Sequence, residues 1–409
     1  MQTLLPSRPV STRPRFVTGP GTWVLAWALA AVLGGCGNHR AHATPPGSTG
    51  STTQQVAATP CPAVGAIRWD AWFGGKGEPG KAVERSLGPE RWHARLPACA
   101  RVQSADKVQI ACDSADQMAR EIEQASLAGI TYWAFVTYPE DDPMNSGLQT
   151  YLQSPAKSRI NFALISELSK WGNASQYRAV IERYSRLLSD RSYQKTSDGR
   201  PIFFLGFVTD EALNTRFGGR APFAKLVQEL RQLVRNTGQG NLYIVLLDKN
   251  VGRAKGLIRD LDLDAVSAYA VADNNVRFGE YEQLTTLTAA FWAEASAAGL
   301  PLLPTVMTGW DRRPRVLNPV PWEGTKFSDE QMERFFKQPT PAELEAHLAA
   351  GLRQAMRPTP GAAFQSVLVY AWNEFDEGGW LAPTLGEGNA RLDAVRRAVG
   401  GVCPRKALN

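Results

Sequence analysis

The sequence SVLVYAW at residues 366–372 is an uninterrupted run without a charged side chain, and the polar segment NEFDEGG at 373–379 follows it directly. Strands of a parallel sheet that are covered on both faces show such continuous apolar runs, whereas half-exposed strands alternate apolar and polar residues. Similar runs precede it at residues 66–73, 130–137, 160–165, 201–208, 241–248, 264–271 and 302–308. The sequence therefore predicts eight strands of one buried, parallel sheet.

Helical patterns lie between these runs. Apolar residues recur at helical spacing over 223–234, the segment TPAE at 340–343 is typical of a helix start, and a last stripe over 392–399 precedes Gly400, an expected helix end. Eight alternating strands and helices favour an α/β fold of the single (β/α)8 (TIM) barrel type over an open doubly wound sheet. The first strand is also not followed by the G-x-G-x-x-G of dinucleotide-binding sheets. We predict one domain over 61–409, with the long connection 309–340 shaping the mouth of the barrel.

The first sixty residues have the composition of a targeting segment. Three arginines precede an apolar run of about eleven residues at 23–33, which is too short to span a bilayer but fits the core of a signal peptide. The run ends in Leu33-Gly34-Gly35-Cys36, which resembles the lipobox of bacterial lipoproteins, in which the cysteine is lipidated. We therefore expect a signal peptide over 1–35 and a lipidated Cys36. The alternative is plain secretion with an incidental cysteine.

Residues 36–60 are rich in Gly, Ser, Thr and Pro, so they are expected to form a flexible tether behind the lipid. Gly37 stands where an inner-membrane retention signal usually has Asp, which favours the outer membrane. The expected protein is exported and touches the membrane through its lipid anchor only. We expect the folded domain to be a monomer.

The charge of the chain gives no reason to expect nucleic-acid binding. The formal net charge of +6 includes three leader arginines and no leader acids, so the mature chain carries +3. A weakly positive domain without Lys/Arg clusters lacks the basic surface that nucleic-acid binding requires.

Four cysteines remain after Cys36, namely Cys61, Cys99, Cys112 and Cys403. Export permits disulfides, and three pairings are possible. We favour Cys99–Cys112, which are close in sequence, and Cys61–Cys403, because a closed barrel brings its first strand beside its last helix. The alternative is four free thiols. Their spacing does not match a metal site.

The segment after the eighth strand carries the strongest chemical signal. Glu374, Asp376 and Glu377 fall within four positions, between Trp372 and Trp380. In a barrel, the ends of the strands carry the catalytic groups. Crowded carboxyls in a partly desolvated mouth raise at least one pKa, so that one of them stays protonated near neutral pH, as glycoside hydrolysis requires. The alternative is a solvated acidic loop or helix start.

Three motifs carry a resemblance to a known family. Trp372-Asn373-Glu374-Phe375-Asp376-Glu377-Gly378 resembles the W-N-E-W-x-E-G signature of glycoside hydrolase family 99 and the related WbsX-like proteins. The segment WDAWFG at 69–74 resembles the A-W-Y-G segment of that family, and GWDRRPR at 309–315 resembles the G-W-D-x-x-P-R of the WbsX-like group. The likeness extends over roughly residues 65–400.

The resemblance implies a (β/α)8 barrel and retaining, endo-acting cleavage of α-mannosides through a 1,2-anhydro sugar. By motif position it implies that Glu374 deprotonates the 2-hydroxyl of the substrate and that Glu377 protonates the leaving oxygen and then activates water. No metal, cofactor or protein nucleophile is implied. Phe375 replaces the usual Trp, and the segment WLAP at 380–383 lacks a Glu that the family often has before the Pro, so mannose specificity is not transferred.

Other residues near strand ends are candidates for binding sugar hydroxyls or stacking on sugar rings. They are Asp70, Trp72, Tyr269, Trp310, Asp311, Trp372 and Asn373. The structural alternatives are a strand-end cap for Asp70, a loop salt bridge for Asp311, and ordinary packing for the aromatic residues. Arg312, Arg313 and Arg315 either recognise an anionic sugar or anchor their loop.

The sequence thus predicts a retaining, metal-independent glycoside hydrolase that acts on a polysaccharide or its oligosaccharides, with Glu374 and Glu377 as catalytic residues and without a cofactor. Two other hypotheses stay open. One is a non-catalytic carbohydrate-binding lipoprotein, in which two crowded carboxylates would have little use. The other is a WbsX-like glycosyltransferase in polysaccharide biosynthesis, which would need an activated sugar donor that the periplasm does not supply.

Overall fold

Eight parallel strands form the central sheet of the computed structural model, which describes residues 61–73, 77–323, 328–359 and 361–403. In sheet order the strands are β8, β7, β6, β5, β4, β1, β10 and β9, and all of their pairings are parallel. A single parallel bridge between Val266 on β8 and Leu302, just before β9, brings the two edges together. The chain therefore folds as a nearly closed (β/α)8 barrel, and the predicted fold class is confirmed.

The eight predicted strands are all present, and all but β5 are shorter than predicted. They are β1 Ala63–Arg68, β4 Tyr132–Val136, β5 Asn161–Glu167, β6 Ile202–Gly206, β7 Tyr243–Leu247, β8 Ala265–Ser267, β9 Thr305–Met307 and β10 Ser366–Tyr370. The largest difference is in the first strand, which was expected at 66–73 but ends at Arg68. Residues 70–73 form a buried turn instead, and the apolar pattern does not separate a buried turn from a buried strand.

Two short antiparallel pairs complete the strands. They are β2 Ala100–Ser104 with β3 Lys107–Ile110, and β11 Asn373–Glu374 with β12 Gly379–Trp380. The second pair is a small hairpin that directly follows β10, so it lies at the carboxyl end of the barrel. This hairpin carries the acidic motif.

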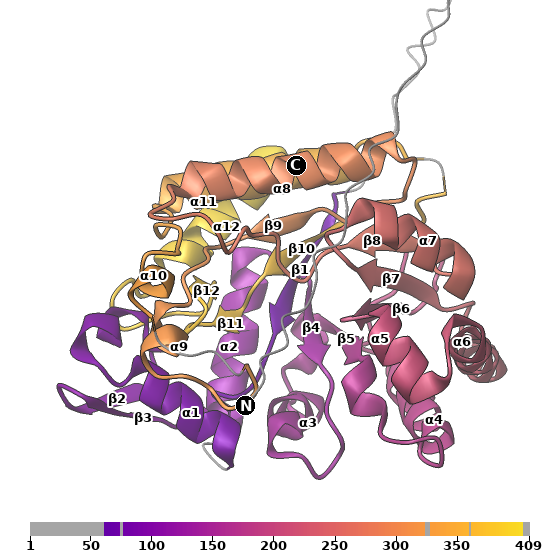
Figure 1. Cartoon of the computed structure of the whole chain (residues 1–409), viewed down its shortest axis with the longest axis horizontal. Coiled ribbons are helices and arrows are strands. Elements are labelled where there is room, and N and C mark those ends of the chain that lie inside the picture. Colours follow the sequence, from indigo (N-terminus) through magenta and orange to yellow (C-terminus); the bar gives the residue numbers. More distant parts are fainter. Residues whose placement is uncertain (1–60, 74–76, 324–327, 360, 404–409) are drawn as a thin grey trace, which may run out of the picture. The chain divides into compact units, whose positions relative to one another are not determined.

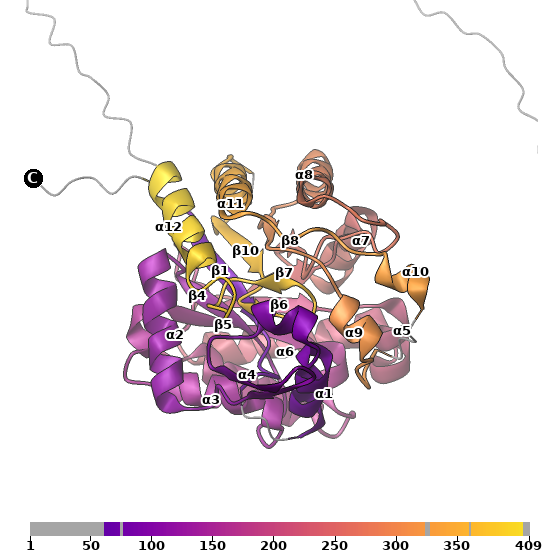
Figure 2. The ribbon, with the colours of Figure 1, turned by 90° about the vertical axis from the view of Figure 1, so that its left-hand side faces the viewer.

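A helix follows each barrel strand. The helices are α1 Glu78–Leu87, α2 Ala115–Ala128, α3 Ser146–Gln153, α4 Tyr177–Leu188, α5 Asp210–Ala212, α6 Arg220–Asn236, α7 Val251–Leu261, α8 Tyr281–Ala297, α9 Arg313–Leu317, α10 Asp329–Met332, α11 Pro341–Ala355 and α12 Ala390–Val402. The last helix, α12, packs against both α11 and α2, which closes the helical layer around the strands (Figures 1 and 2). Within the described ranges, no helix is long and apolar enough to cross a membrane.

The sequence predicts a helix start at Thr340 and a helix end at Gly400, and only the start is confirmed. Thr340 caps α11, and its side chain and that of Glu343 form the reciprocal capping box that the sequence predicts. The expected end at Gly400 is wrong, because α12 continues through Gly400 and Gly401 to Val402. Glycine lowers the helix propensity but does not forbid a helix, and the next residue, Cys403, closes the turn with a hydrogen bond to the Val399 carbonyl.

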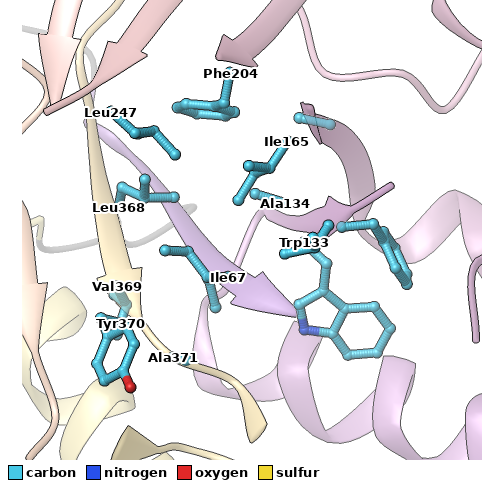
Figure 3. Close-up of a cluster of buried hydrophobic side chains, with 14 of the residues drawn as sticks. Ile67, Trp133, Ala134, Ile165, Phe204, Leu247, Leu368, Val369, Tyr370 and Ala371 are labelled. Carbon is cyan, nitrogen blue, oxygen red and sulfur yellow. The ribbon is translucent and has the colours of Figure 1, made fainter. Parts of the chain in front are cut away.

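The interior of the barrel is filled by apolar side chains from all sides of the sheet. Figure 3 shows Ile67, Ala134, Ile165, Phe204, Leu247 and Leu368 directed toward one another from β1, β4, β5, β6, β7 and β10. All but Leu247, which is 6% exposed, are at most 1% exposed. The strands are continuously apolar because their other face is covered by the helices. The barrel is therefore a packed core, and a substrate site has to lie at its ends.

Two disulfides fasten the domain. Cys61 is bonded to Cys403, with Cα atoms 5.8 Å apart, and Cys99 is bonded to Cys112, with Cα atoms 5.5 Å apart. This is the pairing that the sequence favours. The first joins the two ends of the domain, and the second closes the β2–β3 hairpin. The signal peptide, Cys36 and the tether, expected over 1–60, lie outside the described residues.

Candidate active site

The hairpin of β11 and β12 holds both glutamates of the acidic motif. Glu374 is the last residue of β11, and Glu377 follows in the turn, where its carbonyl accepts a hydrogen bond of 2.7 Å from the Asp311 amide. Gly378 adopts φ +83°, and a Cβ there would lie 2.5 Å from the Asp311 backbone nitrogen. The glycine after the second glutamate is therefore required by the close approach of the loop that follows β9.

Glu374 is buried, with 3% of its surface exposed. Its Oε1 accepts a hydrogen bond of 2.7 Å from the Tyr269 hydroxyl, and Arg315 Nη2 lies 3.4 Å from its Oε2. Burial and the charge of Glu377 raise the pKa of Glu374 well above its ordinary value, and Arg315 offsets only part of this. Burial therefore favours the protonated form of Glu374.

Glu377 is surrounded by more positive charge. It forms an ion pair with Arg315, its other oxygen accepts a hydrogen bond from the Tyr370 hydroxyl, and Arg312 Nε lies 3.5 Å from Oε1. Burial alone would raise the pKa of Glu377, but Arg315 and Arg312 lower it below its ordinary value. The two arginines therefore favour the ionised form of Glu377, and the surroundings shift the pKa values of the two glutamates in opposite directions.

Arg315 organises these carboxylates from α9. Its guanidinium is 4% exposed and donates two hydrogen bonds to Asp376, of 2.8 and 2.9 Å, and one of 2.7 Å to Glu323. Each of the three arginines after β9 is committed to a carboxylate, since Arg313 pairs with Asp311 and Arg312 with Glu323. This arrangement agrees with the loop-anchor interpretation, while Arg312 and Arg315 also line the cavity described below.

The two glutamates line a cavity of about 1080 Å³ at the carboxyl ends of the strands. The predicted residues Tyr269 and Trp310 line it as well. Sequence reasoning missed four other aromatic residues of its wall, which are Trp69, Tyr138, Phe207 and Trp322. Trp69, Tyr138 and Phe207 lie shortly after barrel strands, a position that suits a binding residue, and Trp322 lies in the long loop 309–340.

Trp69 and Trp322 form one part of this wall. Their ring centroids are 5.7 Å apart, Trp322 is 44% exposed, and the Trp69 indole donates a hydrogen bond of 2.8 Å to the Tyr138 hydroxyl. Trp310 lies 5.5 Å from Tyr370, whose hydroxyl contacts Glu377. Aromatic faces therefore border the carboxylates on more than one side.

The remaining predicted binding residues do not reach this cavity. Asp70, Trp72, Trp372 and Asn373 line a separate cavity of about 400 Å³ between α2 and the loops that follow β1 and β10. Burial raises the pKa of Asp70 to about 6, although its ion pair with Arg68 at 2.9 Å acts in the opposite direction. These four residues lie beside α2, outside the cavity that holds the two glutamates.

Asn373 and Asp311 each form hydrogen bonds to protein groups. The side-chain Oδ1 of Asn373 accepts a hydrogen bond of 2.9 Å from the Trp69 backbone amide, and its Nδ2 donates one of 3.2 Å to Asp70 Oδ1. Asp311 is 1% exposed and paired with Arg95 and Arg313. Burial would raise the pKa of Asp311, but these two arginines lower it below its ordinary value. Asp311 therefore forms the loop salt bridge that was the alternative to binding a sugar hydroxyl.

The part of the chain that the structure describes contains no group of three or more His, Cys, Asp or Glu side chains that could hold a metal ion.

No protein-family model matches the sequence, and no curated protein matches it either. Among solved structures, the fold is similar to the glycoside hydrolase family 99 endo-α-mannosidase of Bacteroides thetaiotaomicron in complex with bis-tris propane. That match has a TM-score of 0.54 and 16% identity, and it covers 83% of this chain and 97% of that chain. A second structure of a family 99 endo-α-mannosidase from that organism gives 0.50 and 15%, covering 82% and 95%. At this identity the likeness establishes the (β/α)8 fold.

Proposed function

We propose that this protein is a retaining glycoside hydrolase that cleaves glycosidic bonds of a polysaccharide or its fragments. The observation that carries the proposal is the pair Glu374 and Glu377, two buried carboxyls at the wall of a large cavity, whose surroundings raise the pKa of Glu374 and lower that of Glu377. Glycosidic cleavage needs one protonated and one ionised carboxyl beside the scissile bond. The aromatic wall suits the apolar faces of sugar rings. The likeness in fold to an endo-α-mannosidase supports the same class of reaction.

The contacts of the two glutamates support a division of their roles. The resemblance of the acidic motif to the family signature gives the base role to Glu374 and the acid role to Glu377. The opposite division agrees better with the electrostatics of this chain, because Arg315 and Arg312 stabilise an ionised Glu377, while Glu374 is desolvated beside that charge. We therefore assign the acid role to Glu374 and the base role to Glu377.

The reaction then proceeds in two steps without a metal or cofactor. Glu377 accepts the proton of the substrate's 2-hydroxyl, the freed oxygen attacks the anomeric carbon, and the glycosidic bond breaks as Glu374 protonates the leaving oxygen. This step forms a 1,2-anhydro sugar. In the second step water attacks the anomeric carbon, the ionised Glu374 accepts a proton from that water, and Glu377 returns its proton to the 2-oxygen. Two inversions at one carbon give net retention, and only water is consumed.

We also propose that the enzyme is exported and lipid-anchored at Cys36 to the outer membrane. The lipobox-like segment 33–36 and the two disulfides support this, because disulfides persist in oxidising compartments outside the cytoplasm. Incorporation of a labelled fatty acid that Cys36→Ser abolishes, together with recovery of the wild type in the outer-membrane fraction, is the expected result. A wild-type protein that incorporates no label would contradict the anchor and leave the enzymatic proposal untouched.

The function is tested by product release from a panel of soluble polysaccharides that includes α-mannan and the exopolysaccharide of the producing organism. Wild type and the variants Glu374→Gln and Glu377→Gln are compared by reducing-end assay, and the anomeric form of the first product is read by NMR. Glu78→Gln is a matched control, since Glu78 lines the same cavity but pairs with Arg85 at the exposed surface. We expect release with retention by wild type and the control, and loss in both site variants. Binding without release would identify a carbohydrate-binding protein instead.

A further inference from the structure

Phe207 combines three features that rarely occur in one residue. It directly follows β6, its backbone has φ +54°, and 53% of its surface is exposed. Left-handed backbone is uncommon for residues other than Gly, Asn and Asp, and for a bulky side chain it is an outlier. A residue that only turned the chain here would be expected to be glycine. The phenyl ring is therefore retained at a position that disfavours it.

The ring of Phe207 lies in the wall of the cavity, close to the carboxylates. Its nearest aromatic partner is Tyr269, at 5.4 Å between ring centroids, and the Tyr269 hydroxyl donates to Glu374. A single side chain thus separates the exposed ring from the carboxyl that is assigned the acid role.

The sheet order places Phe207 across the mouth from the catalytic hairpin. In one direction around the barrel, β5, β4 and β1 lie between β6 and β10. In the other direction, β7, β8 and β9 lie between them when the bridge at Val266 is counted as closing the barrel. The two strands are therefore four pairings apart either way. The Trp69–Trp322 part of the wall begins at β1, which is the neighbour of β10. Phe207 therefore lines the cavity from a strand across the barrel from β10, whereas the tryptophan pair begins at the strand next to β10.

We propose that Phe207 is a substrate-positioning residue that stacks on the apolar face of a sugar ring beside Glu374. The inference rests on the proposed function in that the ligand is a saccharide. It goes further because it names a binding residue that lies outside the three motifs. Exposed aromatic rings are unfavourable in water and become favourable when an apolar sugar face covers them. The strained backbone presents the ring to the cavity, which agrees with the tendency of such strain to occur at ligand sites.

The chain supplies a matched control. Phe278 has the same residue type, a similar backbone with φ +49° and a similar exposure of 56%. Its ring packs against Phe335 at 5.7 Å, and it does not line the cavity. Replacing either phenylalanine by glycine relieves left-handed backbone, but only one replacement removes a ring from the proposed site.

The experiment measures binding and stability separately. Saccharide binding is measured by quenching of tryptophan fluorescence in the inactive Glu377→Gln protein, alone and combined with Phe207→Gly, Phe207→Tyr or Phe278→Gly. The probe is the panel polysaccharide that wild type cleaves or, without cleavage, the one that it binds. We expect Phe207→Gly to weaken binding about tenfold, the effect of losing one stacked ring. Its melting temperature is expected to stay equal or rise, while Phe207→Tyr and Phe278→Gly bind within about twofold of the parent.

The other outcomes separate a failure of this inference from a failure of the proposed function. Unchanged binding by Phe207→Gly with a lower melting temperature would show a purely structural role. Equal weakening by Phe278→Gly would show a general loosening of the domain. If the wild type releases no product but its saccharide binding depends on Phe207, the proposed hydrolase function is wrong and the role of Phe207 in binding is supported. If no member of the panel binds wild type, both the function and this inference are wrong.

Discussion

Arg315 and Asp376 form a two-pronged ion pair in which Nε and Nη2 of the arginine each donate to one oxygen of the carboxylate, at 2.8 and 2.9 Å. Both side chains are nearly inaccessible to solvent. Because the third nitrogen of the same guanidinium contacts Glu377, the pair fixes the cation that lowers the pKa of Glu377. Asp376, the acidic residue between the two glutamates, thereby has a role in positioning and not in the chemistry.

Removing the Arg315 guanidinium should damage activity and stability together. We expect Arg315→Met to lower kcat/KM by about 100-fold, because an oriented charge at the site is lost. The free energy of unfolding should fall by about 3 kcal/mol, because Asp376 and Glu377 lose their buried partner. Arg315→Lys should recover part of the stability but little activity, since an ammonium cannot donate as a fork. Denaturant unfolding and steady-state kinetics measure both.

Arg178→Met is the control for this series. Arg178 pairs with Glu182 one helical turn away, and both side chains are largely exposed. Its loss should change stability by less than about 1 kcal/mol and leave kcat/KM unchanged. An Arg315→Met variant with wild-type kinetics would show that Arg315 only anchors its loop.

The assignment of acid and base is tested with leaving groups of different acidity. A leaving phenol of low pKa departs without protonation, so an enzyme without its acid still cleaves such an aryl glycoside. We expect the kcat/KM of Glu374→Gln, which reports the first step, to fall about 1,000-fold on the polysaccharide but less than about 10-fold on a dinitrophenyl glycoside of the same sugar. Glu377→Gln should lose activity on both. The reverse pattern, with Glu377→Gln retaining the aryl substrate, would restore the division of roles that the family motif implies.

Asp70 should make stability depend on pH between about 4 and 6. Its pKa is raised to about 6 in the folded chain, so over this window the folded state binds more protons than the unfolded state. The stabilisation is present below pH 4 and is lost as pH rises through 6. Relative to Asp70→Asn, wild type should therefore lose about 3 kcal/mol of unfolding free energy between pH 4 and pH 7. Urea unfolding at several pH values gives this difference directly, and parallel profiles for the two proteins would contradict it.

The two disulfides should differ in their contribution to stability. Cys61–Cys403 closes a loop of 342 residues and Cys99–Cys112 one of 13. Loop-closure entropy predicts a loss of about 5 kcal/mol for Cys61→Ser with Cys403→Ser, against about 3 kcal/mol for the other pair. Denaturant unfolding of the two double variants measures the losses. A larger loss of unfolding free energy for Cys99→Ser with Cys112→Ser would mean that local packing at the β2–β3 hairpin outweighs loop-closure entropy.

Much of the fold could be read from continuous apolar runs. All eight were confirmed as barrel strands, because strands covered on both faces leave a signal that short half-exposed strands lack. The position of Glu374 and Glu377 in the large cavity followed as well, since the strand-end rule placed their loop at the carboxyl end of the barrel. Tyr269 and Trp310 were found in the same way.

The same rule placed Asp70, Trp72 and Trp372 at the mouth, whereas the structure turns them toward α2 and a separate cavity. The side to which a residue points after a strand ends depends on the turn that follows. That turn is set by partners far along the chain, such as Asn373, which contacts the Trp69 amide across 304 positions. Phe207 and Trp322 were missed because a single aromatic residue in a loop carries no periodic signal.

The sequence by itself determined the number and order of the strands, the loop that carries the two glutamates and the favoured pairing of the cysteines. These features depend on local composition and on chain order, which the sequence contains directly. The tertiary structure alone decided which surroundings shift the pKa of each glutamate and which aromatic rings face the cavity. A charge state depends on burial and on distances to charges such as that of Arg315, which lies 62 positions before Glu377 and reaches it only when the loop after β9 folds over the hairpin.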